Sequence, residues 1–403
     1  MTANSLDTGN SAAGSTWNHF LFRVICKLGT VGTGLIAIVA GLLYAKQESL
    51  LYFPEISGIP RRPASNPRNY RSPSEYDIPF TSHMIKCADN VSIHAWLLLQ
   101  KHNTATSPTI IFFHGNAGNI GLRLPNAAQM YKKLGCNIFM VEYRGYGDSE
   151  DCKPNESGLK LDAEAAYQFL LNAESSNIDI DTSKIFVFGR SLGGAVAFHL
   201  AKYGELSINK PLRGIIVENT FTSISKMVDQ LMPAIAPLKF LVLRMDWNSE
   251  RIAPILKTPV LYLAGDIDEL VPHSQMQDLY KKSLLGSVYA KMHIIRNGTH
   301  NDSWVQGGRE YYKAINAFMS HVIIQGDSLL TTAKLNSVNG LSTSLSDTGS
   351  SMEVTLGGEL SEVNEPIEGT IPIMPSNMIG MAKEASISFS TNAGSASNKK
   401  KEI

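Results

Sequence analysis

The sequence predicts an α/β fold with a mainly parallel, doubly wound sheet, an antiparallel N-terminal hairpin, a small helical cap and an N-terminal transmembrane helix. Three observations lead to this prediction. From residue 109 onward, short apolar runs alternate with stretches of helical spacing, which is typical of βαβ units. Residues 184–194 have the pattern of a strand, a tight turn and a helix. Residues 28–45 carry no charge and are just long enough to span a bilayer as a helix.

Composition limits the classes of function. The 403-residue chain is 43% apolar, enough for one large domain or two ordinary ones. Its 36 basic and 36 acidic residues cancel, and no long basic run precedes the terminal Lys399–Lys401, so nucleic-acid binding has little support. The cysteines lack Cys-x-x-Cys spacing, which argues against a zinc site. At most one disulfide is expected, and free buried thiols are favoured; the cysteines are Cys26, Cys87, Cys136 and Cys152.

The N-terminal region is predicted to attach the chain to a membrane. Residues 1–27 are expected to be a disordered segment, because the first part of it is small and polar. Residues 28–45 are expected to cross the bilayer once as an anchor. A cleaved signal peptide and a buried core helix are the alternatives, and the long polar lead argues against the first. Basic residues flank both ends of the run (Arg23 and Lys27 before it, Lys46 after it), so the charges leave its orientation open.

Residues 46–75 are rich in proline and arginine and are predicted to be an extended linker. The globular domain is expected over residues 76–325. It begins with alternating runs at Met84–Cys87 and Val91–Leu99, separated by a turn at 88–90, and this pattern predicts an antiparallel hairpin.

Beyond the hairpin, the alternation of strands and helices implies right-handed crossovers and a mainly parallel sheet. Ligands bind such sheets at the carboxyl ends of the strands. The strands are expected at Thr109–Phe113, Asn137–Tyr143, Ile185–Phe188, Leu212–Glu218, Pro259–Ala264 and Ala290–Ile295. The helices are expected at Leu122–Leu134, Ser157–Asn172, directly after Ser191, at Ser274–Leu285 and at Arg309–Ile323.

Two segments interrupt this alternation. Residues 219–258 insert two apolar helical pieces, around Ile224–Ala236 and Leu238–Met245, and we interpret them as a small cap over the site. An ordinary crossover helix with extra length is the alternative. Residues 326–403 are dominated by Ser, Thr, Asn and Gly, and are predicted to be a disordered tail.

Ser191 is the candidate nucleophile, because it occupies the centre of a Gly-x-Ser-x-Gly turn between a strand and a helix. Gly189 and Gly193 fit this turn, where side chains would clash with the packed strand and helix. The pentapeptide alone is weak, since a chain of this length contains one by chance roughly one time in five. Its context therefore decides its value.

A serine hydroxyl needs a base to accept its proton and a third group to orient that base. Asp268 follows the strand at 260–264, and His300 follows the strand at 292–295. The chain order Ser, Asp, His is that of doubly wound hydrolases. Ser191, Asp268 and His300 are therefore the predicted catalytic residues.

Other residues compete for these roles. Asp266 is an alternative acid, but its place at the turn of Gly265 favours a turn-forming role. His293 is an alternative base, but it lies within a predicted strand. His273 and His199 lie on helix faces, where a packed or solvated histidine is usual.

The developing oxyanion requires two backbone N–H groups. Leu192 is expected to supply one, because it follows the nucleophile. Asn116 is expected to supply the other, from the small-residue loop at 114–118. The Asn116 side chain has an alternative role in the loop's own hydrogen bonding. Arg190 either shapes the site or is a surface charge.

Several runs carry a resemblance to the serine hydrolases of the α/β-hydrolase superfamily. The chain is most similar to the branch of alpha/beta hydrolase domain-containing protein 13 and its bud-emergence-protein relatives, over roughly residues 20–320. The resemblance implies a type II single-pass protein with a non-cytoplasmic catalytic domain, and Ser191, Asp268 and His300 as its triad. The runs are His114–Asn119, Tyr143–Gly147, Gly189–Gly194, Glu218–Ile224 and Gly298–Asp302.

These features predict a hydrolase that cleaves an ester or thioester through an acyl-enzyme. Membrane attachment and the apolar cap favour an acyl-lipid or palmitoyl-type substrate. The mechanism requires no metal and no organic cofactor. The alternative hypothesis is a catalytically silent, membrane-anchored binding or scaffold protein. A non-cytoplasmic domain would expose glycosylation sequons at Asn90 and Asn155, whereas those at Asn297 and Asn301 crowd His300.

Overall fold

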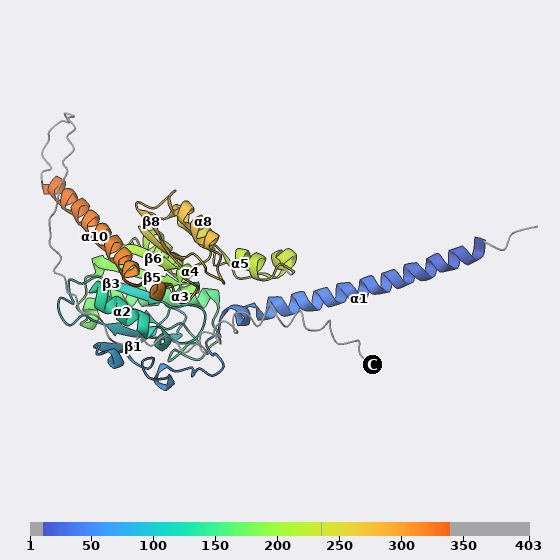
Figure 1. The fold of residues 1–403 in the computed structure, drawn as a ribbon, viewed down its shortest axis with the longest axis horizontal. Coiled ribbons are helices and arrows are strands. Elements are labelled where there is room, and N and C mark those ends of the chain that lie inside the picture. Colours follow the sequence, from blue (N-terminus) through green and yellow to red (C-terminus); the bar gives the residue numbers. More distant parts are fainter. Residues whose placement is uncertain (1–10, 235, 339–403) are drawn as a thin grey trace, which may run out of the picture.

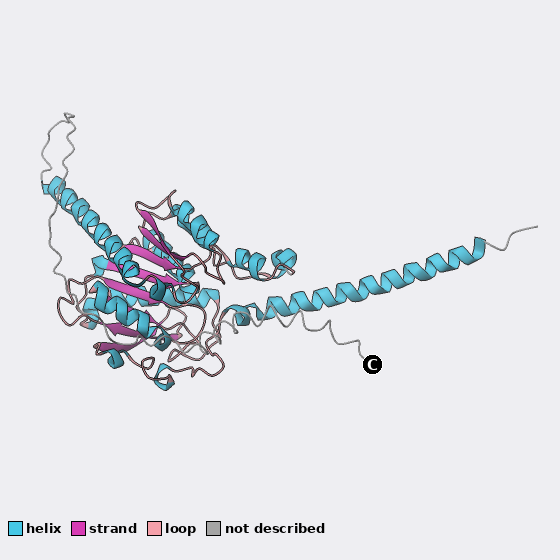
Figure 2. Ribbon diagram, in the orientation of Figure 1, coloured by secondary structure: helices cyan, strands magenta, loops and turns pink. Residues whose placement is uncertain are grey.

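A computed structural model describes residues 11–234 and 236–338. Within them, eight strands form one sheet in the order β1-β2-β4-β3-β5-β6-β7-β8. β1 and β2 form an antiparallel hairpin, β2 is antiparallel to β4, and the other pairs are parallel (Figure 2). The predicted fold class is confirmed. The strands are Phe80–Lys86, Ser92–Leu98, Thr109–Phe113, Asn137–Val141, Ile185–Arg190, Gly214–Glu218, Val260–Gly265 and Ala290–Ile295.

Helices cover both faces of the sheet (Figure 1). α2 and α10 pack on one face, while α3, α4 and α8 cover the other. The central strands are buried on both faces, which explains their nearly continuous apolar sequences. The covering helices are α2 (Leu124–Leu134), α3 (Glu156–Leu171), α4 (Leu192–Lys202), α8 (His273–Ser283) and α10 (Gly308–Val338), and the short α9 is Ser303–Gln306.

The helix α1 (Ser11–Leu51) projects away from the sheet (Figure 1). Its stretch Phe22–Leu51 is long and apolar enough to cross a membrane: an 18-residue window within it has a mean hydropathy of 1.9 and contains no buried residue. Residues 11–27 were expected to be disordered but are helical. The physical reason is that no proline occurs before Pro54, so the helix extends beyond the apolar run in both directions.

Residues 46–75 are not an extended linker, which corrects the sequence prediction. Their first six residues complete α1, and the remainder packs on the domain. Ile56, Ile59 and Tyr70 are buried against Leu122. These apolar side chains, placed among the prolines and arginines, bind the segment to the loop that follows β3.

The segment between β6 and β7 contains α5 (Ile224–Leu231), α6 (Lys239–Val242) and α7 (Ser249–Ile252). Both of the first two helices are shorter than predicted, and α5 ends at Leu231 because Pro233 follows it. Part of the apolar surface of this segment is exposed, with Phe240 at 79%, and its role as a cap over the site stays a prediction.

The C-terminal tail also begins later than predicted. α10 continues to Val338, so residues 326–338 are helical rather than disordered. The rest of the predicted tail, residues 339–403, lies outside the described residues.

Candidate active site

Ser191 sits at the turn between β5 and α4 with φ 54° and ψ −119°, a strained conformation that lifts the side chain above the sheet. The flanking glycines are required by close backbone packing. A Cβ on Gly189 would lie 2.1 Å from the Gly193 carbonyl oxygen, and one on Gly193 would lie 2.2 Å from that of Phe113. The glycine requirement expected from the sequence therefore has a geometric cause.

Asp268 and His300 meet at the carboxyl ends of β7 and β8. The His300 Nδ1 lies 2.8 Å from the Asp268 Oδ2, and both side chains are nearly inaccessible to solvent. Because a carboxylate only accepts, Nδ1 carries the proton and Nε2 keeps its lone pair. The Asp268 Oδ1 accepts the N–H groups of Leu270 and Val271, both at 2.8 Å. The acid is thus fixed in place, and it orients a histidine that can act as a base.

The competing residues have other surroundings. Asp266 lies in the turn after β7, where its N–H donates to the Ile295 carbonyl. His293 lies within β8, and burial lowers its pKa. His273 begins α8, and His199 on α4 pairs with Glu164. Of the candidate acids and bases, Asp268 and His300 are the two that contact each other at the carboxyl ends of the strands.

Asn219 links the loops that carry these residues, a role that sequence reasoning did not assign. It follows β6 in a left-handed conformation. Its Nδ2 donates to the carbonyls of Thr299 (2.9 Å) and His300 (3.2 Å). It also donates to the Ser303 Oγ, while its Oδ1 accepts the Gly265 N–H at 2.8 Å. The signal was present in the Asn-Thr-Phe-Thr-Ser run, but the run alone does not reveal these partners.

The loop after β3 lies beside Ser191. A Cβ on Gly115 would lie 3.7 Å from the Ser191 Cβ. In the described part of the chain, the N–H groups of Leu192 and Asn116 do not donate to protein acceptors, as an oxyanion site requires. The Asn116 side chain donates to the Leu51 carbonyl at 2.9 Å. It therefore joins the loop to the end of α1, rather than bonding within the loop.

Arg190 is neither a surface charge nor a wall of the site. It is buried, with its Nε 2.8 Å from the Glu218 Oε1 and its Nη2 2.9 Å from the Asn126 Oδ1. The Tyr311 hydroxyl donates to the same glutamate. This network crosses from β5 to β6 beneath Ser191, and the Glu218 carbonyl accepts the Ser191 N–H at 2.9 Å. It supports the turn from below.

Glu142 and His114 form a second buried pair beneath the loop. The Glu142 carboxyl accepts the Ile120 N–H at 3.1 Å, and burial raises its pKa to about 8. The His114 Nδ1–H donates to the Gly115 carbonyl, and burial lowers the histidine pKa to about 3. Burial thus favours the neutral form of both groups.

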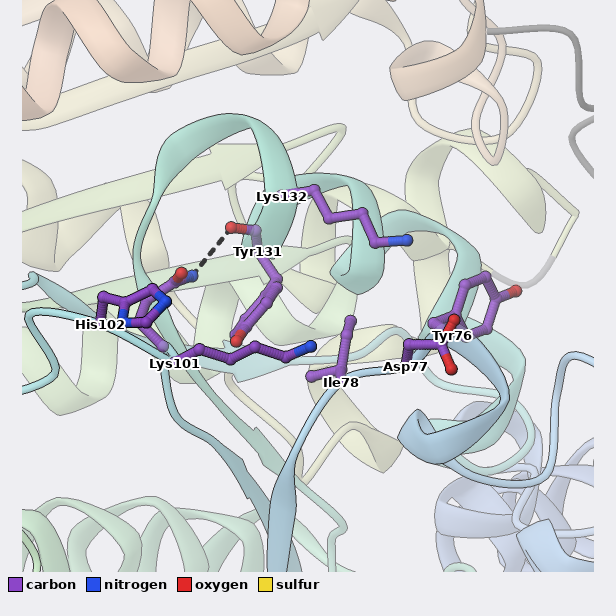
Figure 3. A pocket seen from close by; sticks show the side chains of 8 residues that line it. Tyr76, Asp77, Ile78, Lys101, His102, Tyr131 and Lys132 are labelled. Atoms are coloured by element: carbon purple, nitrogen blue, oxygen red, sulfur yellow. Dashed lines mark hydrogen bonds between the residues drawn. The ribbon is translucent and has the colours of Figure 1, made fainter.

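A hollow of about 360 Å³ lies elsewhere on the domain (Figure 3). The Gln100 amide donates across it to the Tyr131 carbonyl at 2.9 Å. The residues that line it precede β1, follow β2 or lie near the end of α2, so they lie at the amino ends of the parallel strands, opposite Ser191. Within the described residues there is no group of three or more His, Cys, Asp or Glu arranged to hold a metal ion.

Comparison with known proteins identifies the family. The chain is 34% identical to the Schizosaccharomyces pombe protein bem46 over 301 residues, covering 74% of this chain and 94% of bem46. It is 38% identical to the Arabidopsis thaliana alpha/beta hydrolase domain-containing protein WAV2, covering 71% of this chain and 91% of WAV2. The chain belongs to the α/β-hydrolase family. This membership supports a hydrolase, and the family expected from the sequence is confirmed.

Further matches agree with this membership. The family described as serine aminopeptidase, S33, matches residues 104–247. An uncharacterised membrane protein of Saccharomyces cerevisiae is 32% identical over 71% of this chain and 94% of its own. The Pyrococcus furiosus esterase Pf2001 superposes with a TM-score of 0.51 at 17% identity, covering 66% of this chain and 97% of the esterase. This last likeness shows the fold.

Proposed function

We propose that the protein is a membrane-anchored serine hydrolase that cleaves ester or thioester bonds of acyl substrates. Ser191 is the nucleophile, His300 the base and Asp268 the orienting acid. The observation that carries the proposal is the 2.8 Å contact between His300 and Asp268, which leaves the imidazole Nε2 with a lone pair at the same sheet edge as Ser191. Family membership adds support.

The reaction proceeds through an acyl-enzyme. The Ser191 hydroxyl attacks the carbonyl carbon while the His300 Nε2 takes its proton, and the N–H groups of Leu192 and Asn116 stabilise the oxyanion. His300 then returns the proton to the departing alcohol or thiol. Water repeats the sequence on the acyl-enzyme and releases a carboxylic acid. Asp268 stabilises the imidazolium in both steps.

The proposed substrate is an acyl-lipid or a palmitoyl-type thioester. α1 is long and apolar enough to anchor the chain in a single pass, and a relative is described as a membrane protein. The end of α1 bonds directly to the loop of Asn116. An anchor attached this close to the site favours substrates held in the same bilayer. The proposed orientation is type II, with the domain on the non-cytoplasmic side.

Labelling with a fluorophosphonate tests the nucleophile in detergent-purified full-length protein. Ser191→Ala should abolish labelling. Asp268→Asn and His300→Ala should lower its rate by about 10³-fold or more. Asp266→Asn and His293→Ala are the matched controls and should label like the wild type. Labelling that survives Ser191→Ala would refute the assignment, and a folded wild-type protein that never labels would favour the silent binding protein.

A further inference from the structure

The helices α5 and α6 carry an apolar tip, formed by Leu231 at the end of α5 and by Phe240 and Leu241 of α6. Their side chains are 41%, 79% and 63% exposed. Lys239, the first residue of α6, pairs with Asp229 near the end of α5 and joins the two helices. The tip therefore belongs to a folded hairpin of helices, and its exposed surface requires a partner or an apolar environment.

This hairpin is fixed to the last turns of α1. The Gln47 side chain is buried between them: its Nε2 donates to the Val242 carbonyl at 3.1 Å, and its Oε1 accepts the Arg244 N–H at 2.8 Å. The Arg244 guanidinium lies 2.8 Å from Glu48 and stacks over the Tyr44 ring at 4.8 Å. These contacts fix the position of the tip along the axis of α1.

The tip is held beside the end of the apolar run of α1, where the helix would leave the membrane. The uncharged run ends at Ala45, and Tyr44 and Arg244 form a tyrosine–arginine pair typical of the membrane–water interface. Phe240 and Leu241 lie within four residues of Arg244 in the sequence. α5 and the adjoining short helix project from the body on the same side as α1 (Figure 1).

The candidate active site is also bonded to the segment that follows α1. The Phe53 N–H donates to the Asn116 carbonyl, and the Gly118 N–H donates to the Phe53 carbonyl, both at 2.9 Å. The Trp247 indole, just beyond the hairpin, donates to the Tyr52 hydroxyl at 2.8 Å. The anchor, the hairpin and the candidate oxyanion loop thus form one connected unit.

We propose that the apolar tip enters the headgroup–acyl boundary of the bilayer that α1 crosses, so that the active site opens onto the membrane surface. This inference rests on the membrane anchoring proposed above. A second copy of the chain is a poorer occupant, because a stable protein interface buries roughly 1,200 Å² or more and the tip offers only a few side chains. A lipid interface accepts individual aromatic and aliphatic side chains beside an anchored helix.

The test measures the depth of the tip in full-length protein reconstituted into phosphatidylcholine vesicles. Cys26 and Cys152 are replaced by serine, and Phe240→Cys then carries an environment-sensitive dye, since the other native thiols are buried. Leu285→Cys is the matched control. Leu285 is 76% exposed and precedes β8, so it lies at the amino ends of the parallel strands. Brominated lipids should quench the dye at position 240 several-fold more than at position 285, and aqueous iodide should do the reverse.

Equal quenching at the two positions would overturn the proposal. So would protection at position 240 from both quenchers that weakens on dilution into excess lipid, since this identifies a second copy as the occupant. The depth measurement needs no turnover, so it remains decisive if the proposed hydrolase activity fails. If activity is present, the double substitution Phe240→Asp and Leu241→Asp should lower hydrolysis of a bilayer-held long-chain ester several-fold relative to a soluble short-chain ester. An unchanged ratio would contradict the inference.

Discussion

Replacement of Asn219 by aspartate tests how the candidate site is held together. Asp has the shape of Asn and also tolerates the left-handed backbone of this position. The Oδ1 acceptor for the Gly265 N–H remains, but the Nδ2 donor to the carbonyls of Thr299 and His300 becomes a second oxygen. The change therefore removes the donor that fixes the histidine loop and places negative charge against two carbonyl oxygens.

The expected cost follows from these contacts. Thr299 keeps the hydroxyl of Ser303 as a donor, whereas the His300 carbonyl loses the side-chain donor that Asn219 provides. An unsatisfied buried acceptor costs about 1–3 kcal/mol, so we expect a loss of stability of about that size. A displacement of the base by about 1 Å costs roughly 100-fold in rate. The kcat for a soluble ester should therefore fall by about that factor with little change in KM.

The assay combines thermal unfolding, ester hydrolysis and the pH profile of kcat/KM. A purely structural role would lower the amount of folded enzyme without moving the pH profile. The proposed positioning role also shifts the acidic limb of the profile, because the introduced carboxylate would lie near the imidazole loop. Asn209→Asp is the matched control, since Asn209 is exposed and also left-handed. A kcat and pH profile for Asn219→Asp equal to those of the control would refute the reasoning.

Three further predictions concern stability and topology. Because burial raises the pKa of Glu142 to about 8, its contribution to stability is complete below the ordinary carboxyl range and is lost as pH rises through about 8. Glu142→Gln should therefore raise the melting temperature relative to wild type more at about pH 9 than at about pH 6; an equal change at both would contradict this. Gly193→Ala should destabilise the fold by about 1–3 kcal/mol and suppress labelling, because its Cβ meets the Phe113 carbonyl; denaturant unfolding measures it, and an unchanged midpoint would oppose it. In eukaryotic cells, a type II orientation should give a glycosidase-sensitive mass shift that Asn90→Gln and Asn155→Gln together remove; its absence from the wild type would argue against that orientation.

The sheet and the placement of the site residues were predictable because their signals are local. Thr109–Phe113 and the other buried strands are continuous apolar runs, and each ends in a loop of small or polar residues. Parallel strands bring those loops to one edge whatever the packing details. The order Ser191, Asp268, His300 could therefore be assigned to one edge before any contact was known.

Other features depend on partners far away in the sequence. Arg190 has the same local surroundings whether it points to solvent or is buried, and its partner Glu218 belongs to another strand. Asn219 likewise bonds to a loop some 80 residues later. The predicted helix lengths were wrong for a different reason. The helix α1 extends past its apolar run because no proline interrupts it, whereas α5 ends at Leu231, two residues before Pro233.

The packing of residues 46–59 shows that the folded domain begins earlier in the chain than the sequence predicts. The sequence places a linker between anchor and domain, which would leave the two free to move independently. In the structure, Gln47 is buried against the helical hairpin, and Phe53 pairs with the loop of Asn116 through two backbone hydrogen bonds. A displacement of the end of α1 must therefore break these bonds or move the candidate oxyanion loop. The end of α1 is therefore bonded to the candidate oxyanion loop, and the geometry of Asn116 depends on how α1 is held.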